Sequence, residues 1–276
     1  MLTLSQLDLV IVLAAGEGTR MKSTRPKVLH EIAGRSLLGH VLHATSALSS
    51  QSTTVVVGAG KDDVIAHLSA IAPDVATVYQ EVRGGTGHAV RLALTDAPSQ
   101  GTLLVCAGDT PLLTGSSLED FLASHRDSGA VASILTAEIP DPFGYGRIVR
   151  TSEGFVSRIV EERDANEAEK EITEINSGVY IFDIASLRES LEKITTNNSQ
   201  KEEYLTDVIK ILTSAGKNVS AYCLEDFTET LGINDRSQLA ECSTLMRERI
   251  NHALMLSGVT IDDPATTWIE IGRAHV

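Results

Sequence analysis

Basic residues, cysteines and long apolar runs are all scarce in this sequence. Lys and Arg number 23 against 37 Asp and Glu, and the resulting net charge of −14 at pH 7 repels nucleic acid and anionic membranes. The three cysteines (Cys106, Cys223 and Cys242) form no CxxC pair, so their spacing does not indicate a disulfide framework or a zinc cluster. We therefore expect the thiols to be reduced and mostly buried. The apolar run 9–15 is too short to span a bilayer, and no basic stretch precedes it as in a secretory signal. We therefore expect a cytoplasmic protein with no nucleic-acid or membrane partner.

The sequence does contain a repeated alternation of strand-like and helix-like patterns. With 276 residues, 42% of them apolar, it is long enough for one large domain, or for a domain with an appendage. The expected strands are 8–13, 53–57, 75–79, 102–107 and 130–135, and the expected helices are 36–48, 64–68, 88–94 and 118–125. Repeated units of this kind predict an α/β fold, a Rossmann-like, mostly parallel open sheet that binds ligands at the carboxyl ends of its strands.

The second half of the chain has a different texture. The expected elements are added β-hairpins laid over the sheet at 147–150 and 155–160, a strand at 175–182, a helix at 204–212 and a strand at 219–224. Gly178 interrupts the strand at 175–182, as though backbone or ligand approached closely there. Apolar residues at spacings of three and four from Arg236 to Ser257 predict a long C-terminal helical arm.

One short segment reverses the overall acidity of the chain. Four cations, Arg20, Lys22, Arg25 and Lys27, lie within eight residues directly after the glycine loop 16–19. Such a loop gathers several N–H groups into one concavity, and Arg and Lys neutralise phosphate oxygens, so the segment predicts a polyphosphate site. It is neither a Walker A sequence nor a GxGxxG loop, because no Gly-Lys-Ser or Gly-Lys-Thr closes it and the third glycine is replaced by Met21. Alone, the loop is equally consistent with a structural turn.

The string Leu13 to Met21, followed by Pro26-Lys27, resembles the signature of nucleotidyltransferases that join sugar 1-phosphates to nucleoside triphosphates. Further segments resemble, in order, the uridyltransferase portion of the GlmU-type family of bacterial bifunctional N-acetylglucosamine-1-phosphate uridyltransferases and glucosamine-1-phosphate N-acetyltransferases. These segments are Gln80 with 85–89, 108–112, 144–148, 159–161, 174–178 and 232–234. The resemblance implies that the protein catalyses a Mg²⁺-dependent in-line transfer in which UTP and N-acetylglucosamine 1-phosphate form UDP-N-acetylglucosamine and pyrophosphate.

The resemblance also implies roles for individual residues. Arg20 would steady the pyrophosphate and Lys27 would contact the reacting phosphates, so both are predicted catalytic groups. Asp109 and Asn234 would hold Mg²⁺, although Asp109, taken alone, is equally suited to cap a helix. The predicted UTP-binding residues are Leu13, Ala14, Ala15, Gly16, Gly18, Lys27, Gln80, Gly85 and Thr86, and the predicted sugar-phosphate-binding residues are Gly146, Glu161, Asn176 and Asn234.

Several residues near these motifs keep two interpretations. We expect His88, at the start of a helix, to pack locally rather than to catalyse. Arg147 either positions a phosphate or lies at the surface. Thr206 matches a family position near the sugar phosphate, although Glu202-Glu203 before it departs from the family pattern, and Ala107 stands where the family has an aromatic residue. Each predicted sugar-binding residue, taken singly, also has a structural interpretation. Gly146 could be a turn glycine, Glu161 a solvated acid at a strand end, and Asn176 a turn-forming asparagine.

The resemblance divides the chain into a uridyltransferase domain (1–235), a helical linker arm (236–257) and the start of a left-handed β-helix (258–269). In the family that β-helix transfers acetyl from acetyl-CoA and builds a trimer, so we expect this chain to lack acetyltransferase activity and to be monomeric. Residues 270–276 coincide with one reading frame of a widely used DNA-sequencing adaptor, which predicts a non-native tail. An ordinary short C-terminus is the alternative, and genomic DNA amplified across the junction would distinguish the two.

Two other functions remain open at this point. One is a nucleotidyltransferase that couples glucose 1-phosphate to TTP, ATP or UTP. The other is a non-catalytic nucleotide-sugar sensor on the same fold, since fold does not fix function. Gln80, the segment 174–178 and the segment around Asn234 favour the acetylated sugar. Catalysis is favoured by the joint presence of four residues, namely Arg20, Lys27, Asp109 and Asn234.

Overall fold

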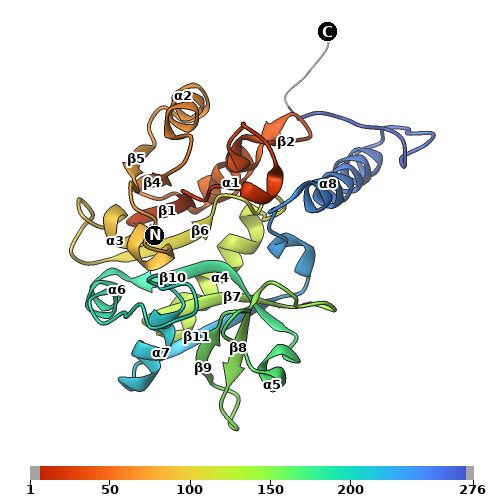
Figure 1. The fold of residues 1–276 in the computed structure, drawn as a ribbon. Coiled ribbons are helices and arrows are strands. Elements are labelled where there is room, and N and C mark those ends of the chain that lie inside the picture. Colours follow the sequence, from red (N-terminus) through yellow and green to blue (C-terminus); the bar gives the residue numbers. More distant parts are fainter. Residues whose placement is uncertain (1–6, 272–276) are drawn as a thin grey trace, which may run out of the picture.

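The protein, seen in a computed structural model that describes residues 7–271, is built on a mixed sheet with helices on both faces (Figure 1). The strand order is β11-β7-β10-β6-β1-β4-β5, with β8 and β9 attached through β10. The parallel half consists of β1 (Leu9–Ala14), β4 (Ser52–Val57), β5 (Ala76–Tyr79) and β6 (Thr102–Ala107). The predicted α/β class, mostly parallel sheet and C-terminal helix are confirmed.

Helices bury the central strand β1 from both sides. Val10 and Val12 face one apolar cluster, under α1 (Leu37–Thr45), α2 (Lys61–Ile71) and α4 (Gly115–Ser128). Leu9 and Ile11 face the other, under α3 (Thr86–Ala93), α6 (Ile184–Leu191) and α7 (Asp207–Ser214). Successive side chains of a strand point to opposite faces, so a continuous apolar run is required where both faces are covered.

The second half of the sheet is antiparallel where the chain returns between β6 and β7 (Ala132–Glu138). The long strand β10 (Glu174–Asp183) pairs with both neighbours, and its register shifts between Asn176 and Tyr180, around Gly178 with φ of 79°. This confirms the interruption predicted at Gly178, but no backbone approaches closely, since nothing in the described part of the chain lies within 4 Å of a Cβ placed there. The last strand, β11 (Val219–Leu224), runs parallel to β7 at the sheet edge.

The predicted hairpin is present, but it is joined to the sheet rather than laid over it. It consists of β8 (Gly146–Arg150) and β9 (Val156–Val160), and β8 pairs with β10 through Gly146 and Arg147. Backbone hydrogen bonding to β10 satisfies the edge of the hairpin, which explains the difference. Together with the short helix α5 (Glu167–Lys170), it lies at the opposite end of the sheet from α2 (Figure 1).

The long C-terminal helix α8 (Arg236–Leu256) forms a wall of the domain for part of its length. Asp235 caps it, and Cys242 and Met246 pack into an apolar cluster with Met21 and Ile233. Figure 1 shows it beside β2 (Glu31–Ile32) and α1. The described residues 257–271 contain neither helix nor strand, and Asn251 donates hydrogen bonds to two carbonyls of this segment, at 2.8 and 2.9 Å. Residues 272–276 of the predicted tail lie outside the described residues.

The remaining elements are short. They are β3 (Arg35–Ser36) and the 3₁₀ turns η1 (Thr19–Met21), η2 (Lys27–Leu29), η3 (Ser46–Leu48) and η4 (Phe227–Thr230). Within residues 7–271 no helix is both long and apolar enough to cross a bilayer. Cys106 and Cys242 are buried, which raises the pKa of each thiol to about 12, whereas Cys223 is exposed on β11.

Candidate active site

The candidate active site lies where the parallel strands β1 and β6 end. Leu13 pairs with Ala107 across these strands, so the glycine loop after β1 and the Gly108-Asp109 turn after β6 leave the sheet at the same edge. A cavity of about 340 Å³ opens there. Its lining consists of Leu13, Ala14, Ala15, Gly16, Glu17, Lys27, Val28, Gln80, Arg83, Gly85, Thr86, Ala89, Ala107, Asp109 and Glu202. Every predicted UTP-binding residue except Gly18 is in this lining.

Gly18 lies just behind the cavity and supports one of its walls. Its φ of +61° places it in the left-handed region, and a Cβ at this position would lie 2.6 Å from Cβ of Lys27. Only glycine lets the stem of Lys27 pack this closely against the loop. The glycine therefore positions Lys27, a role that the predicted contact with UTP did not include.

The four cations of the basic segment do not act together in this structure. Lys27 alone among them lines the cavity, whereas Arg25 forms an ion pair with Glu31 at 2.6 Å and Lys22 is exposed. Arg20 is exposed as well, because Met21 in the same 3₁₀ turn is buried in the apolar cluster beneath α8. The structure thus separates Arg20 from the cavity lining, and its catalytic role stays a prediction.

Lys27 connects the two predicted metal ligands. Its Nζ forms an ion pair with Oδ2 of Asp109 and donates a hydrogen bond to Oδ1 of Asn234 at 3.2 Å. The side chains of Lys27 and Asp109 are only 11% and 18% exposed. The backbone N–H of Ile233 donates to the carbonyl of Asp109 at 3.0 Å, which holds the Asn234 segment beside the end of β6.

The donors at this point fit a magnesium ion. A carboxylate and an amide oxygen are hard ligands, and both are already directed at one cationic group. Within residues 7–271 no group of three or more His, Cys, Asp or Glu could hold a metal. A cation here would therefore take its other ligands from phosphate oxygens and water, as Mg²⁺ commonly does in nucleotide enzymes.

The turn 84–87, which begins α3, is held in place by the segment before α7. The N–H of Gly87 donates to the carbonyl of Glu203 at 2.8 Å, and the N–H of Glu203 donates to the carbonyl of Gly84 at 2.7 Å. Gly85 has φ of +96°, and a Cβ there would lie 2.5 Å from that same Glu203 carbonyl oxygen. Gln80 donates to the carbonyl of Gly85 at 3.0 Å, so the predicted base-binding residues form one fixed unit.

His88 behaves as the local packing residue that was expected. Its Nδ1 lies 3.1 Å from Nε2 of Gln80, and it is not among the residues that line the cavity. Gln80 is buried, so the imidazole helps to fix the orientation of the Gln80 amide.

Three charged residues of the lining were not predicted as site residues, namely Glu17, Arg83 and Glu202. Glu17 and Arg83 form an ion pair at 2.7 Å that joins the glycine loop to the turn before α3, with 36% and 62% of the side chains exposed. Their signal in the sequence is positional only, since Glu17 stands between the two glycines of the loop and Arg83 between Gln80 and Gly85.

Of the predicted sugar-phosphate-binding residues, Asn234 lies beside Lys27, whereas the other three belong to the antiparallel half of the sheet. Gly146 of β8 pairs with Asn176 of β10. The hydroxyl of Thr206 donates to Oε1 of Glu161 at 2.9 Å, and Nδ2 of Asn176 donates to the hydroxyl of Tyr180 at 2.6 Å. None of these residues lines the 340 Å³ cavity, so they form a separate set of polar side chains.

Glu161 is not the solvated strand-end acid that its position alone suggested. Burial raises the pKa of its carboxyl group, and the hydrogen bond from Thr206 opposes this shift without cancelling it. Nearby negative charge on Asp164 and Asp207 adds to the increase in pKa. The hydrogen bond also connects Thr206, which the sequence linked only weakly to the site, with a predicted sugar-binding residue.

The interpretation of Arg147 as a surface residue is wrong. Only 2% of this residue is exposed, and its guanidinium forms an ion pair with Glu162 at 2.8 Å and donates to the carbonyl of Tyr145. Gly146 and Arg147 pair with β10, which draws the Arg147 side chain into the interior. The hydroxyl of Tyr145 accepts a hydrogen bond from the N–H of Gly232 at 3.4 Å, so this hairpin also contacts the segment that carries Asn234.

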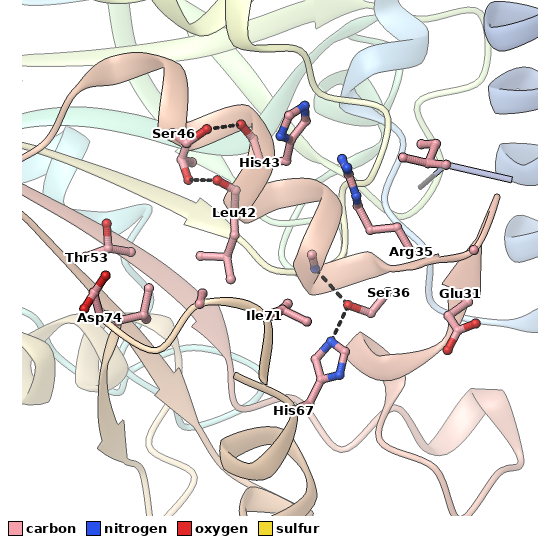
Figure 2. Close-up of a pocket in the computed structure, with 16 residues that line it drawn as sticks. Glu31, Arg35, Ser36, Leu42, His43, Ser46, Thr53, His67, Ile71 and Asp74 are labelled. Atoms are coloured by element: carbon pink, nitrogen blue, oxygen red, sulfur yellow. Dashed lines mark hydrogen bonds between the residues drawn. The ribbon is translucent and has the colours of Figure 1, made fainter. Parts of the chain in front are cut away.

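A larger cavity, of about 660 Å³, lies elsewhere, between α1 and α2 (Figure 2). Ser36 points toward His67 across one of its walls, with 2.7 Å between Oγ and Nε2. The same hydroxyl accepts from the N–H of Gly39 and so caps α1. No predicted site residue lines this cavity, so cavity size does not locate the candidate active site.

Comparisons with known proteins show what this chain is similar to. Residues 10–171 match the family model described as the MobA-like NTP transferase domain. The chain is 51% identical over 267 residues to the bifunctional protein GlmU of Thermobifida fusca, covering 95% of this chain and 55% of that protein. The corresponding protein of Lactococcus lactis subsp. lactis is 53% identical over 261 residues, with coverages of 94% and 56%. The chain thus spans about half the length of these relatives.

A solved structure shares the fold at much lower identity. It is described as UDP-glucose pyrophosphorylase complexed with UDP-glucose, with a TM-score of 0.69 and 17% identity. The match covers 88% of this chain and 100% of that one. At this identity the likeness concerns the fold alone, and it agrees with the sheet described above.

Proposed function

Because the chain belongs to the family of MobA-like NTP transferase domains, we propose that it transfers a uridylyl group from UTP to N-acetylglucosamine 1-phosphate. The products are UDP-N-acetylglucosamine and pyrophosphate. The proposal concerns the portion that this chain shares with its GlmU relatives, about half of their length. One observation carries it, namely that Lys27, Asp109 and Asn234 meet at the rim of the cavity that the glycine loop lines.

The reaction needs no nucleophile from the protein. A phosphate oxygen of the sugar phosphate attacks the α-phosphorus of UTP, and the bond to the bridging oxygen breaks so that pyrophosphate leaves from the opposite side. In such a reaction the protein positions the reactants and neutralises their charge. Asp109 and Asn234 would hold a Mg²⁺ ion, which when bound would supply positive charge to offset the negative charge of the phosphates.

The residues of the nucleotide cavity bind and orient UTP in this proposal. Backbone N–H groups of the glycine loop 16–18 face the phosphates, and the Lys27 ammonium neutralises the reacting ones. Gln80 and the turn at Gly85 hold the uracil, and the contacts of Gly87 and Glu203 keep that turn rigid.

The sugar phosphate binds on the antiparallel half of the sheet. Gly146, Glu161 and Asn176 are the proposed ligands of the N-acetylglucosamine group, and Thr206 orients Glu161 through its hydrogen bond. A carboxylate accepts hydrogen bonds from sugar hydroxyls, and a side-chain amide both donates and accepts them. The absence of a side chain at Gly146 leaves room beside these groups.

Pyrophosphate release tests the proposal. The purified protein is incubated with UTP, N-acetylglucosamine 1-phosphate and Mg²⁺, with parallel reactions that contain ATP, TTP or glucose 1-phosphate. We expect turnover with UTP and the acetylated sugar to exceed each alternative. Preference for glucose 1-phosphate would identify a related nucleotidyltransferase instead, and UTP binding by calorimetry without pyrophosphate release would identify a nucleotide sensor.

A further inference from the structure

One contact in the site has a consequence for the order in which ligands bind. The Lys27 ammonium is bonded to both oxygens that are assigned to the metal, on Asp109 and on Asn234. These three residues come from η2, the end of β6 and the residue before the cap of α8, so the fold brings them together from distant parts of the chain. A cationic group of the protein itself thus holds the two metal ligands.

We propose that Lys27 is an internal counter-cation that closes the metal site until UTP arrives. This inference rests on the proposed function in one respect, the assignment of Asp109 and Asn234 as metal ligands. Two cations cannot share Oδ2 of Asp109 at contact distance without strong repulsion, since the site is only partly exposed. A divalent ion must therefore displace the ammonium in order to bind.

The exchange requires movement of the Lys27 side chain alone, because the backbone at this position is fixed. Val28 and Leu29, which follow it in η2, are buried in the core, and Gly18 packs against its stem. Lys27 also lines the nucleotide cavity, so its ammonium can exchange the Asp109 carboxylate for a phosphate oxygen without any movement of the backbone.

The exchange couples the two ligands. Without nucleotide, the ammonium competes with the metal for Asp109, so the metal binds weakly. The triphosphate of UTP provides a second anionic partner for Lys27, and Asp109 and Asn234 then become available to the metal. Coupling of this kind is reciprocal, so the metal strengthens UTP binding to the same extent.

Manganese, a paramagnetic substitute for Mg²⁺, provides a direct test without nucleotide or turnover. The signal of free aqueous Mn²⁺ is followed by electron paramagnetic resonance as protein is added, for the wild type and for Lys27→Met, which keeps the stem and removes the charge. We expect Lys27→Met to bind Mn²⁺ about tenfold more tightly, within the usual size of a coupling between two sites. Lys27→Gln should show the same direction of change.

Two controls locate the effect. Lys22→Met removes an exposed cation of the same segment and should leave Mn²⁺ affinity unchanged. Asp109→Asn in the Lys27→Met background should abolish the gain, because it removes the carboxylate that the ammonium had covered. A non-specific gain from an unfolded acidic chain would survive Asp109→Asn, so this control also excludes misfolding as the cause.

The outcomes separate this inference from the proposed function. Equal or weaker Mn²⁺ binding by Lys27→Met and Lys27→Gln would overturn the counter-cation role, as would a gain that survives Asp109→Asn. Uridylyl transfer by the wild type is measured separately. Tighter Mn²⁺ binding by the Lys27 variants, with no uridylyl transfer by the wild type, would support the counter-cation role and reject the proposed function. Normal transfer by the wild type, with no gain in Mn²⁺ affinity in the variants, would support the function and reject the counter-cation role.

Discussion

The nucleotide side and the sugar side of the candidate site are built in opposite ways. The nucleotide side uses the backbone of glycine-rich turns at the ends of parallel strands, together with Lys27 and Gln80. The sugar side uses polar side chains of the antiparallel region, such as Glu161 and Thr206, that are hydrogen-bonded to one another. A site made of backbone depends on residues without a Cβ, whereas a site made of side chains depends on pairs of polar groups.

Charge separates the two sides as well. The only cations that line the nucleotide cavity within the described residues are Lys27 and Arg83, and both are paired with carboxylates, of Asp109 and Glu17. On the sugar side, burial and two neighbouring acids raise the pKa of Glu161. Both substrates of the proposed reaction are anionic, so this acidic protein would need positive charge from a metal at the boundary between the sides.

The largest effect is expected where the two sides meet, at Asp109. Asp109→Asn keeps the size of the side chain and removes the charge that holds the metal, so kcat for pyrophosphate release should fall at least about 100-fold. Asp120→Asn, at an exposed position of α4, is the matched control and should retain full activity. Near-normal uridylyl transfer by Asp109→Asn would refute the metal-binding role.

Gly85 tests the dependence of the nucleotide side on its backbone. Gly85→Ala introduces a Cβ 2.5 Å from the carbonyl oxygen of Glu203 at a φ of +96°. We expect a loss of about 2–4 kcal/mol in the free energy of unfolding, the combined size of backbone strain and overpacking, and a higher KM for UTP. Urea denaturation and initial rates measure the two quantities.

Gly216→Ala is the control for this comparison. Gly216 also has positive φ, of +70°, but nothing lies within 4 Å of a Cβ placed there. Its replacement should cost only the strain, about 1 kcal/mol, and leave the KM for UTP unchanged. Equal losses for the two variants would show that the contact with Glu203 does not matter.

The nucleotide side was the more predictable of the two, for a physical reason. Local chemistry suits a glycine loop to phosphate and a strand-end carboxylate to metal, and the family resemblance then decided these roles for Gly16, Gly85 and Asp109. The structure brings the three residues to one edge. The parallel strands were equally readable, because runs that are buried on both faces are continuously apolar. Strand β6 has the bounds expected from its sequence.

The partners of these residues could not be read in the same way. The contact of Lys27 with Asp109 joins residues that are 82 positions apart, and the burial of Arg147 depends on pairing between β8 and β10. Tertiary contacts decide such features, and local propensity does not encode them.

Thr206 tests the polar pairing of the sugar side, with a smaller expected effect. Thr206→Val keeps the shape of the side chain and removes the hydrogen bond to Glu161. Such a bond contributes about 1 kcal/mol, so the KM for N-acetylglucosamine 1-phosphate should rise about fivefold while the KM for UTP stays constant. The control is Thr213→Val, in the helix α7 that Thr206 begins. It removes a hydroxyl that donates to the Ser157 carbonyl and should change neither KM. Parallel increases in both KM values would argue against separate sides.

The smallest effect concerns stability, and it distinguishes the two functions that Glu161 could have. Burial raises the pKa of this carboxyl above its ordinary value of 4.5, so folding favours the neutral form. The stability that the group contributes is fully present below pH 4.5 and is lost as the pH rises through its pKa in the folded protein. At pH 7 ionisation of this carboxyl group therefore opposes folding, and Glu161→Gln should raise the Tm.

The same substitution should weaken binding of the sugar phosphate, because a residue kept for function need not suit the fold. Tm is measured from pH 4 to pH 8, and the gain from Glu161→Gln should shrink as the pH falls toward 4, where both side chains are neutral. Glu153→Gln, in the exposed turn between β8 and β9, should show no such pH-dependent gain. A Tm at pH 7 that is equal to or below that of the wild type would mean that Glu161 stabilises the fold through its contacts. In that case Glu161 and its partners would serve to stabilise the fold, and would not form a binding site that lowers the stability of the protein.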